Sequence, residues 1–231
     1  MVFLYEEDQV IGNIGFFPET VFSIGPVHIT STVTTTWLVM AVIIIICFFL
    51  TRRLSLRPSI LQEILEAAFE SIEKTIKDVL PVEPWMVVPV LGTFWILIGF
   101  SNLTGLLPGL KTPTADLNTT FAFAVISYSM THVFGITTQG FKGYLSHYKE
   151  PTWVLLPFRI IAEFTRTVAL AVRLFGNMLS GDMIGLILLG VVGFLVPVPF
   201  DLLHFIIGLI QAYIFGVLTL VFIAEGVRIK T

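Results

Sequence analysis

Long hydrophobic stretches without charged residues make up most of the chain, and short polar segments separate them. Residues 21–50, for example, contain no Asp, Glu, Lys or Arg. A membrane helix needs about 20 apolar residues to cross a hydrocarbon core of about 30 Å, and five stretches meet this length. We therefore predict an all-α membrane protein with five transmembrane helices, at residues 28–51, 85–107 and 117–141 and, as a long helical hairpin, within residues 157–226.

Residues 58–80 follow a different pattern. Apolar residues recur there at helical spacing, with several Glu and Lys residues between them. A helix with one apolar face and this many charges is too polar to span a bilayer, and it is typical of a helix that lies along the membrane surface or against a partner helix. We expect one amphipathic helix here, at the cytoplasmic interface.

Basic residues indicate the orientation of these spans. Arg52, Arg53 and Arg57 directly follow the first span, and Arg228 and Lys230 follow the last. Cytoplasmic segments of membrane proteins carry an excess of Lys and Arg. The sequence thus predicts a carboxyl terminus in the cytoplasm and an amino-terminal segment, residues 1–27, that lies outside.

The composition agrees with a single integral membrane domain over residues 1–231. Hydrophobic residues make up 55% of the chain and charged residues 13%, about half of the share that soluble domains carry. The net charge of −3 gives no indication of nucleic-acid binding. The single Cys47 excludes a disulfide framework or a cysteine metal site, and we expect no metal and no cofactor.

The first segment of the hairpin differs from the other spans because it is apolar yet carries ionisable and amide side chains. At about 1.5 Å per residue its roughly 36 residues form a helix of about 54 Å, which exceeds the hydrocarbon core. The helix must therefore tilt steeply or break, and we favour tilt. The polar residues are Arg159, Glu163, Arg166, Arg173, Asn177 and Asp182.

Arg173 has the highest energetic cost of these residues, because placing a permanently charged guanidinium near mid-membrane costs about 3 kcal/mol or more of free energy. Glu163 lies ten residues earlier, and Asp182 lies nine residues later and half a turn round the helix. The order acid, arginine, acid is what two offset ion pathways need, since the arginine repels a cation that would run straight through. A structural ion pair is the alternative. For Arg166, an ion pair with Glu163 is the expected explanation.

The returning helix carries His204 and Gln211, seven residues apart and hence on one face. If the chain reverses near Gly193, His204 lies level with Asp182 and Gln211 lies near the depth of Arg173. An imidazole beside a carboxyl group in a wet cleft can relay protons.

The remaining histidines are interpreted as hydrogen-bonded structural residues. They are His28, His132 and His147.

Three other function classes compete with an ion pathway on these residues alone. A secondary transporter or channel would use Arg173 as a substrate counter-ion, but such folds often show inverted repeats, and no repeat is evident. An intramembrane enzyme such as a lipid hydrolase would need a base near Ser180, and its own helix offers no histidine. A purely structural anchor leaves the order of charges unexplained.

The segment Arg173-Leu174-Phe175-Gly176-Asn177-Met178 resembles the signature of the F-type ATP synthase a subunit, the membrane stator subunit of the Fo sector. The resemblance extends to Gly181-Asp182, to residues 204–215 and to residues 114–118, and it covers nearly the whole chain. Two positions depart from it: many relatives have Glu in place of Asp182, and some have Lys in place of Arg166. The shorter acid leaves open whether Asp182 contacts His204 directly.

The resemblance implies a role for each candidate residue. Arg173 would be the essential stator charge that separates two half-channels, and Glu163 would line the cytoplasmic one, with Arg166 as an auxiliary charge. The outer half-channel would be lined by Asn177, Asp182, His204 and Gln211, with Asp116 near its mouth.

The resemblance also implies a mechanism and partners. The chain would not be an enzyme by itself. It would pass protons or sodium ions to and from the carboxylates of a c-subunit ring, couple ion flow to rotation, and assemble with the b-subunit peripheral stalk and the remaining ATP synthase subunits in membrane lipid. The ion-binding site of the ring subunits would decide between protons and sodium ions, although the presence of His204 favours protons. The acidic start without a transit-like leader favours a bacterial inner membrane over an organelle.

Overall fold

The computed structural model describes residues 20–24, 27–52, 60–80, 84–107, 110–149, 156–193 and 196–227. Six α-helices lie within these ranges, and five of them are long and apolar enough to cross a membrane, which confirms that count. The sixth, α3 (Ile60–Val79), is the one expected to be amphipathic. The five long helices are α2 (Ser31–Thr51), α4 (Val88–Leu103), α5 (Leu117–Lys149), α6 (Leu156–Val192) and α7 (Pro197–Val227).

A short β-ribbon precedes the first long helix and was not predicted. Strand β1 (Thr20–Ile24) pairs antiparallel with β2 (Val27–Thr30), and α2 begins at the next residue. Hydroxyl side chains occupy this junction, where Thr30 and Thr32 are hydrogen-bonded at 2.8 Å. Besides the α-helices and this ribbon, the described part of the chain contains three short 3-10 turns, η1 (Pro84–Met86), η2 (Thr104–Leu106) and η3 (Pro113–Ala115).

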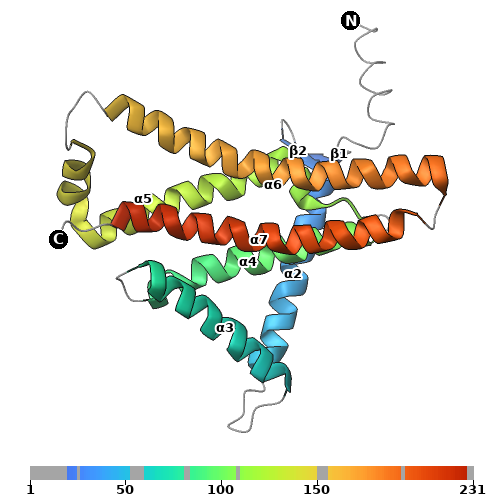
Figure 1. The fold of residues 1–231 in the computed structure, drawn as a ribbon, viewed down its shortest axis with the longest axis horizontal. Helices are drawn as coiled ribbons and strands as arrows, with labels where there is room; N and C mark the ends of the chain where they lie inside the picture. The colour runs from blue at the N-terminus through green and yellow to red at the C-terminus, as the bar shows by residue number, and fades with distance from the viewer. Residues whose placement is uncertain are drawn as a thin grey trace, which may run out of the picture.

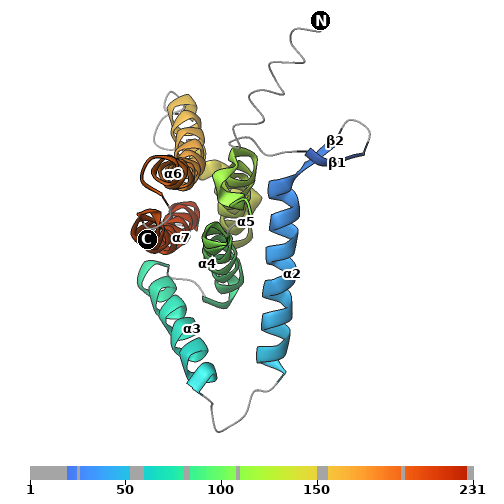
Figure 2. The same cartoon turned by 90° about the vertical axis from the view of Figure 1, so that its right-hand side faces the viewer.

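Helices α4 to α7 form a bundle, and α2 stands at its side (Figures 1 and 2). The long axis of α2 runs across the direction of α6 and α7 in Figure 1. Apolar side chains such as Trp37, Ile44 and Phe49 remain exposed along α2, which carries no charged residue. Exposed apolar side chains at this density suit a lipid environment, because water would strongly disfavour them.

The centre of the bundle is α7, which contacts α4, α5 and α6. Its side chains Ala212 and Phe215 pack with Phe94 of α4, Phe123 of α5 and Leu174 of α6 in one buried apolar cluster. Close approach of α4 requires a small residue, because a Cβ at Gly216 would collide with the indole of Trp95. That indole Nε1 donates a hydrogen bond to the backbone oxygen of Tyr213 at 3.1 Å, so α4 and α7 are held in a defined register.

Helix α6 is continuous over 37 residues, so the long polar segment does not break. It runs antiparallel beside α7, and the chain reverses near Gly193, whose φ of +88° suits a residue without a side chain. Helix α5 instead changes direction at Gly140, where φ is +72°. This kink lies next to the expected end of the third span.

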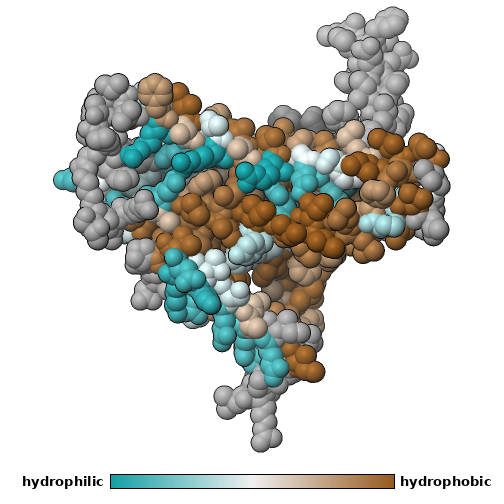
Figure 3. Space-filling model, in the orientation of Figure 1, coloured by the Kyte–Doolittle hydropathy of each residue, from teal (hydrophilic) through white to brown (hydrophobic). Residues whose placement is uncertain are grey.

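Helix α3 docks onto the bundle mainly through its carboxyl-terminal end. Ile76 is fully buried, and together with Leu80 it packs against Val87 and Leu91 beside α4 and against Ile223 of α7. The exposed side of the helix carries most of its charges and forms one of the hydrophilic bands on the face shown in Figure 3. The amphipathic pattern is therefore used in part for helix packing.

Candidate functional site

Two separate cavities lie along the α6–α7 hairpin. The larger, of about 770 Å³, is bounded by the second half of α6, the first half of α7, the turns η2 and η3, and the start of α2. We call it the Asp182 cavity, because it contains Asp116, Asp182, Asp201 and His204 in its wall. The smaller, of about 340 Å³, lies between α5, the first third of α6 and the end of α7. We call it the Glu163 cavity.

His204 lies against α6 in the Asp182 cavity. This agrees with the prediction that a reversal near Gly193 places His204 level with Asp182. A Cβ at Gly181 would fall on the imidazole ring, so the ring packs directly on the α6 backbone beside Asp182. One helical turn further along α6, a Cβ at Gly185 would lie 3.3 Å from the Oδ1 of Asp201. Glycines on α6 thus let α7 bring an imidazole and a second carboxyl group close to Asp182.

Asp116 lies at the other side of the same cavity and is buried, with 7% of its surface exposed. Its Oδ2 accepts a hydrogen bond from the Oγ1 of Thr32 at 2.5 Å, and its Oδ1 accepts one from the backbone N–H of Asn118 at 2.9 Å. The first bond ties α2 to the start of α5. Asp116 therefore has a fixed position in the cavity wall.

The neighbouring turn is fixed by a second polar network. The Oγ1 of Thr114 donates to the Oδ1 of Asn102 at 2.5 Å, and the Nδ2 of Asn102 donates to the backbone oxygen of Gly208 at 2.7 Å. All of these groups are buried, and buried polar groups stabilise a fold only when they are paired in this way. The network joins η3, α4 and α7 behind Asp116.

Arg173 lies on α6 between the two cavities, and its side chain is exposed. Its neighbours Leu170, Ala171 and Leu174 are instead buried in the core. Among the residues that the structure describes, Glu163 and Arg166 of α6 each have an ionic partner, and Arg173 has none. The expected alternative, an ion pair within the chain, therefore gains no support, and the guanidinium faces outward from an apolar surface.

Asn177 and Gln211 also lie between the cavities. Gln211 is buried on α7, with 7% of its surface exposed, and Asn177 is half-buried on α6. Neither belongs to the wall of the Asp182 cavity. The structure thus brings three of the predicted outer-pathway residues to one cavity, namely Asp116, Asp182 and His204, and leaves these two amides outside the walls of both cavities.

The barrier between the cavities is the packed apolar core. On α6 the wall of one cavity ends at Thr167 and that of the other begins at Met178, a separation of about 16 Å along the helix. Leu170, Ala171 and Leu174 fill this interval and pack against α7. Protein interiors of this kind leave few voids as large as a water molecule. Packed apolar side chains therefore lie between the two cavity walls where α6 meets α7.

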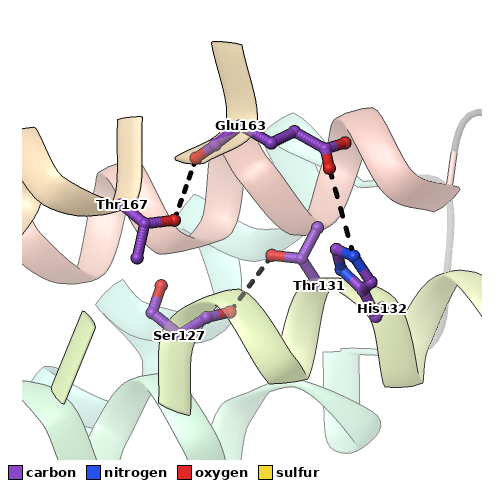
Figure 4. A network of polar contacts seen from close by, with 5 residues as sticks. All are labelled: Ser127, Thr131, His132, Glu163 and Thr167. Carbon is purple, nitrogen blue, oxygen red and sulfur yellow. Dashed lines mark hydrogen bonds and ion pairs between the residues drawn. The ribbon is translucent and has the colours of Figure 1, made fainter. Parts of the chain in front are cut away.

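In the Glu163 cavity, a histidine interpreted as structural in the sequence lies opposite the predicted carboxylate. The Nε2 of His132 on α5 is 4.0 Å from the Oε2 of Glu163 on α6 (Figure 4). Nearby hydroxyls are directed to backbone oxygens: Thr167 donates to Glu163 at 3.0 Å and Thr131 donates to Ser127 at 3.1 Å. The sequence signal for His132 was weak, because nothing acidic lies near it in the chain.

Arg166 has a partner that the sequence did not predict. Its guanidinium is hydrogen-bonded to the carboxylate of Glu225 on α7, whereas an ion pair with Glu163 had been expected. Both Arg166 and Glu225 line the Glu163 cavity. The antiparallel course of the hairpin explains the difference, since it brings the end of α7 near the part of α6 that carries Arg166.

Comparison with known proteins identifies relatives that align with this chain over most of their length. The family model described as ATP synthase A chain matches residues 33–224. The chain is 47% identical over 208 residues to ATP synthase subunit a 1 of Hahella chejuensis, and the aligned region covers 90% of this chain and 88% of that protein. It is 45% identical over 219 residues to ATP synthase subunit a of Legionella pneumophila strain Philadelphia 1, with coverage of 94% and 95%. Identity to ATP synthase subunit a of Moorella thermoacetica is 38% over 211 residues, with coverage of 91% and 97%.

Proposed function

Because this chain belongs to the ATP synthase subunit a family, part of the ion-translocating Fo sector, we propose that it is the stator subunit that provides two offset half-channels for ions. It acts in a membrane complex with other ATP synthase subunits and is not catalytic by itself. We further propose the role of Arg173, the ring and stalk partners and the orientation in the membrane that are described below.

One observation carries the proposal: two cavities flank an exposed arginine and are separated by packed apolar side chains. An ion cannot move from one cavity to the other inside the chain. It must be handed to a group that travels along the outer face of α6. A ring of c subunits, each with one carboxylate, is a partner with this chemistry, because a neutralised carboxylate can turn into lipid and an ionised one cannot.

The outer half-channel is the Asp182 cavity. An ion enters past Asp116 and reaches Asp182 and His204, which lie against the same stretch of α6 and α7. From there it neutralises a ring carboxylate near Asn177. Gln211, buried between the cavities, is positioned to hydrogen-bond groups at the depth of Arg173.

Arg173 favours release of the ion on the other side. Its fixed positive charge stabilises the ionised form of a ring carboxylate that comes within a few ångströms. The released ion leaves through the Glu163 cavity toward the cytoplasm, with Arg166 as an auxiliary charge. The same charge blocks a cation from running directly between the cavities, so ion flow requires rotation of the ring.

The placement in the membrane follows from the same assignment. The amino-terminal segment lies outside, the carboxyl terminus lies in the cytoplasm, and α3 lies along the cytoplasmic interface. The crossing of α2 with α6 and α7 in Figure 1 supports a steep tilt of the hairpin, since α2 has the length of a simple span. The bacterial relatives support the inner membrane of a bacterium, where the b-subunit stalk completes the stator.

The test is Arg173→Ala in the assembled complex, reconstituted in lipid vesicles. We expect ion-driven ATP synthesis to fall to background while the membrane sector still passes ions down their gradient, because the barrier between the half-channels has lost its charge. Arg52→Ala is the matched control, since Arg52 is also an exposed arginine but lies at the end of α2. Synthesis that survives in Arg173→Ala would refute the half-channel assignment.

A further inference from the structure

The Glu163 cavity contains an imidazole and a carboxylate that face each other from two helices. His132 of α5 and Glu163 of α6 are both half-buried, and their Nε2 and Oε2 atoms are 4.0 Å apart. This distance exceeds that of a direct hydrogen bond. A small rotation of either side chain, or one bridging water molecule, closes it. The pair is therefore placed for proton transfer in a wet cavity.

The position of His132 is defined by aromatic neighbours. The ring of Tyr128 lies 4.2 Å from the imidazole centroid and that of Tyr144 lies 5.9 Å away. The Nδ1 atom is buried and has no hydrogen-bond partner among the described residues. An orphaned buried nitrogen is costly in a histidine whose only role is structural. The side that faces the cavity is Nε2, which is the atom nearest Glu163.

Several other charged and polar groups around the cavity have partners of their own. Arg166 is bonded to Glu225, so these two charges compensate each other. The hydroxyls of Thr131 and Thr167 donate to backbone oxygens rather than to the carboxylate. The full set that lines the cavity with His132 is Tyr128, Tyr144, Arg159, Glu163, Arg166 and Glu225.

We propose that His132 is a proton-relay residue of this cavity, and this inference rests on the proposed function. A proton leaves the carboxyl O–H bond of a ring subunit and forms a carboxyl O–H bond on Glu163. That bond breaks as an Nε2–H bond forms on His132, which leaves a carboxylate beside an imidazolium. The Nε2–H bond then breaks to a water molecule of the cavity, and the neutral imidazole is restored. Imidazole suits this task because it exchanges protons near neutral pH.

The relay carries protons and cannot carry sodium ions, so it also bears on ion specificity. A histidine gains and loses a proton in each cycle, whereas a sodium ion would have to pass an imidazole that offers it a single nitrogen ligand. Sodium sites in proteins are built mainly from oxygen ligands, as for other hard cations. A functional role of His132 thus predicts a complex driven by protons.

The test uses His132→Ala and His132→Gln in the assembled complex in vesicles, with ATP synthesis driven by an imposed proton gradient. We expect synthesis to fall about tenfold in both variants. This is less than the factor of about 10²–10⁴ that a positioned acid–base group contributes to a chemical step, because water carries part of the flux. Imidazole added on the cavity side should restore most of the rate in His132→Ala, where space is open, and little in His132→Gln. Ser129→Ala is the matched control, since Ser129 is exposed on α5 and bonds only within its own helix.

A purely structural histidine predicts a different result. Loss of synthesis that imidazole does not restore in His132→Ala would overturn the relay, and so would a full rate in both variants or a complex that sodium alone drives. If His132→Ala does not assemble, a full rate in His132→Gln overturns the proposal, and a tenfold loss with normal assembly supports it.

Arg173→Ala in the same vesicles separates the two proposals. If Arg173→Ala retains synthesis, the proposed function fails. If Arg173→Ala loses synthesis while the His132 variants behave as wild type, the relay alone fails.

Discussion

The two cavities of the hairpin differ in size, charge and origin. The Asp182 cavity is more than twice as large, and its wall carries three aspartates and one lysine. The wall of the Glu163 cavity carries two arginines and two glutamates, together with His132. A cleft lined mainly by one sign of charge raises the local concentration of counter-ions, and a balanced one does not. The first arrangement suits the capture of cations from dilute solution, and the second suits their release.

The cavities also differ in how α6 and α7 meet. At the Asp182 cavity glycines on α6 bring the helices close, and His204 packs on bare backbone. At the Glu163 cavity the helices are linked through long side chains, Arg166 and Glu225. Close packing fixes a position rigidly, whereas a link between flexible side chains can rearrange. Three experiments test these differences, in order of expected effect.

The largest effect is expected from Gly181→Val, which adds a side chain where the imidazole of His204 lies. The ring must move away from Asp182, and overpacking of this kind costs about 1–3 kcal/mol. We expect proton-driven ATP synthesis to fall about tenfold or more, because small displacements of reacting groups have large effects on rate. The rate is measured in vesicles at equal complex content.

The control for this variant is Gly190→Val on the same helix. No side chain lies within 4 Å of a Cβ built at Gly190, so the added side chain meets open space. Its synthesis rate should match the unaltered complex. Equal rates in the two variants would show that the contact between His204 and α6 does not matter for function.

A smaller effect is expected at the Arg166–Glu225 link. Arg166→Glu alone or Glu225→Arg alone places like charges together, while the double variant restores a pair with exchanged signs. Both side chains are about half-exposed, so each single variant should lower synthesis about fivefold, equivalent to about 1 kcal/mol. Recovery in the double variant checks that the link depends on charge pairing. A double variant no better than either single one would mean that Arg166 acts through another group.

The smallest effect is expected from Asp201→Asn, which removes one negative charge from the wall of the Asp182 cavity. We expect synthesis to fall about twofold at low ionic strength and to approach the unaltered rate at high salt, where the field is screened. The rate is compared over a series of salt concentrations. Asp78→Asn, at an exposed position on α3, is the control. A loss that persists unchanged at high salt would point to a direct role of Asp201 in proton transfer.

Much of the candidate site could be predicted because it depends on spacing within single helices. Glu163, Arg173 and Asp182 occupy one continuous helix, so their order and depth follow from a rise of about 1.5 Å per residue. The level of His204 followed from the position of the reversal near Gly193, which a tight connection fixes closely. The signature residues around Arg173 then indicated the family that the comparison established.

Partners on different helices were predicted poorly. Arg166 was expected to pair within its own helix, yet it bonds Glu225, 59 residues later. The hydrogen bond from Thr32 to Asp116 spans 84 residues and had no signal in the pattern. His132 was interpreted as structural because its acidic neighbour lies on the next helix. The β-ribbon before α2 was missed because residues 20–30 are uncharged and were included in a hydrophobic stretch.

The amino-acid sequence by itself therefore determined the number of long apolar helices, the amphipathic character of α3 and the order of charges along α6. These are local properties that hydropathy and helix geometry impose on each segment. Only the tertiary structure decided that the polar residues divide between two cavities, that an apolar core separates them, and that Arg173 faces outward between them. These features depend on which faces of neighbouring helices meet and at what depth, and close packing of side chains from distant parts of the chain sets both.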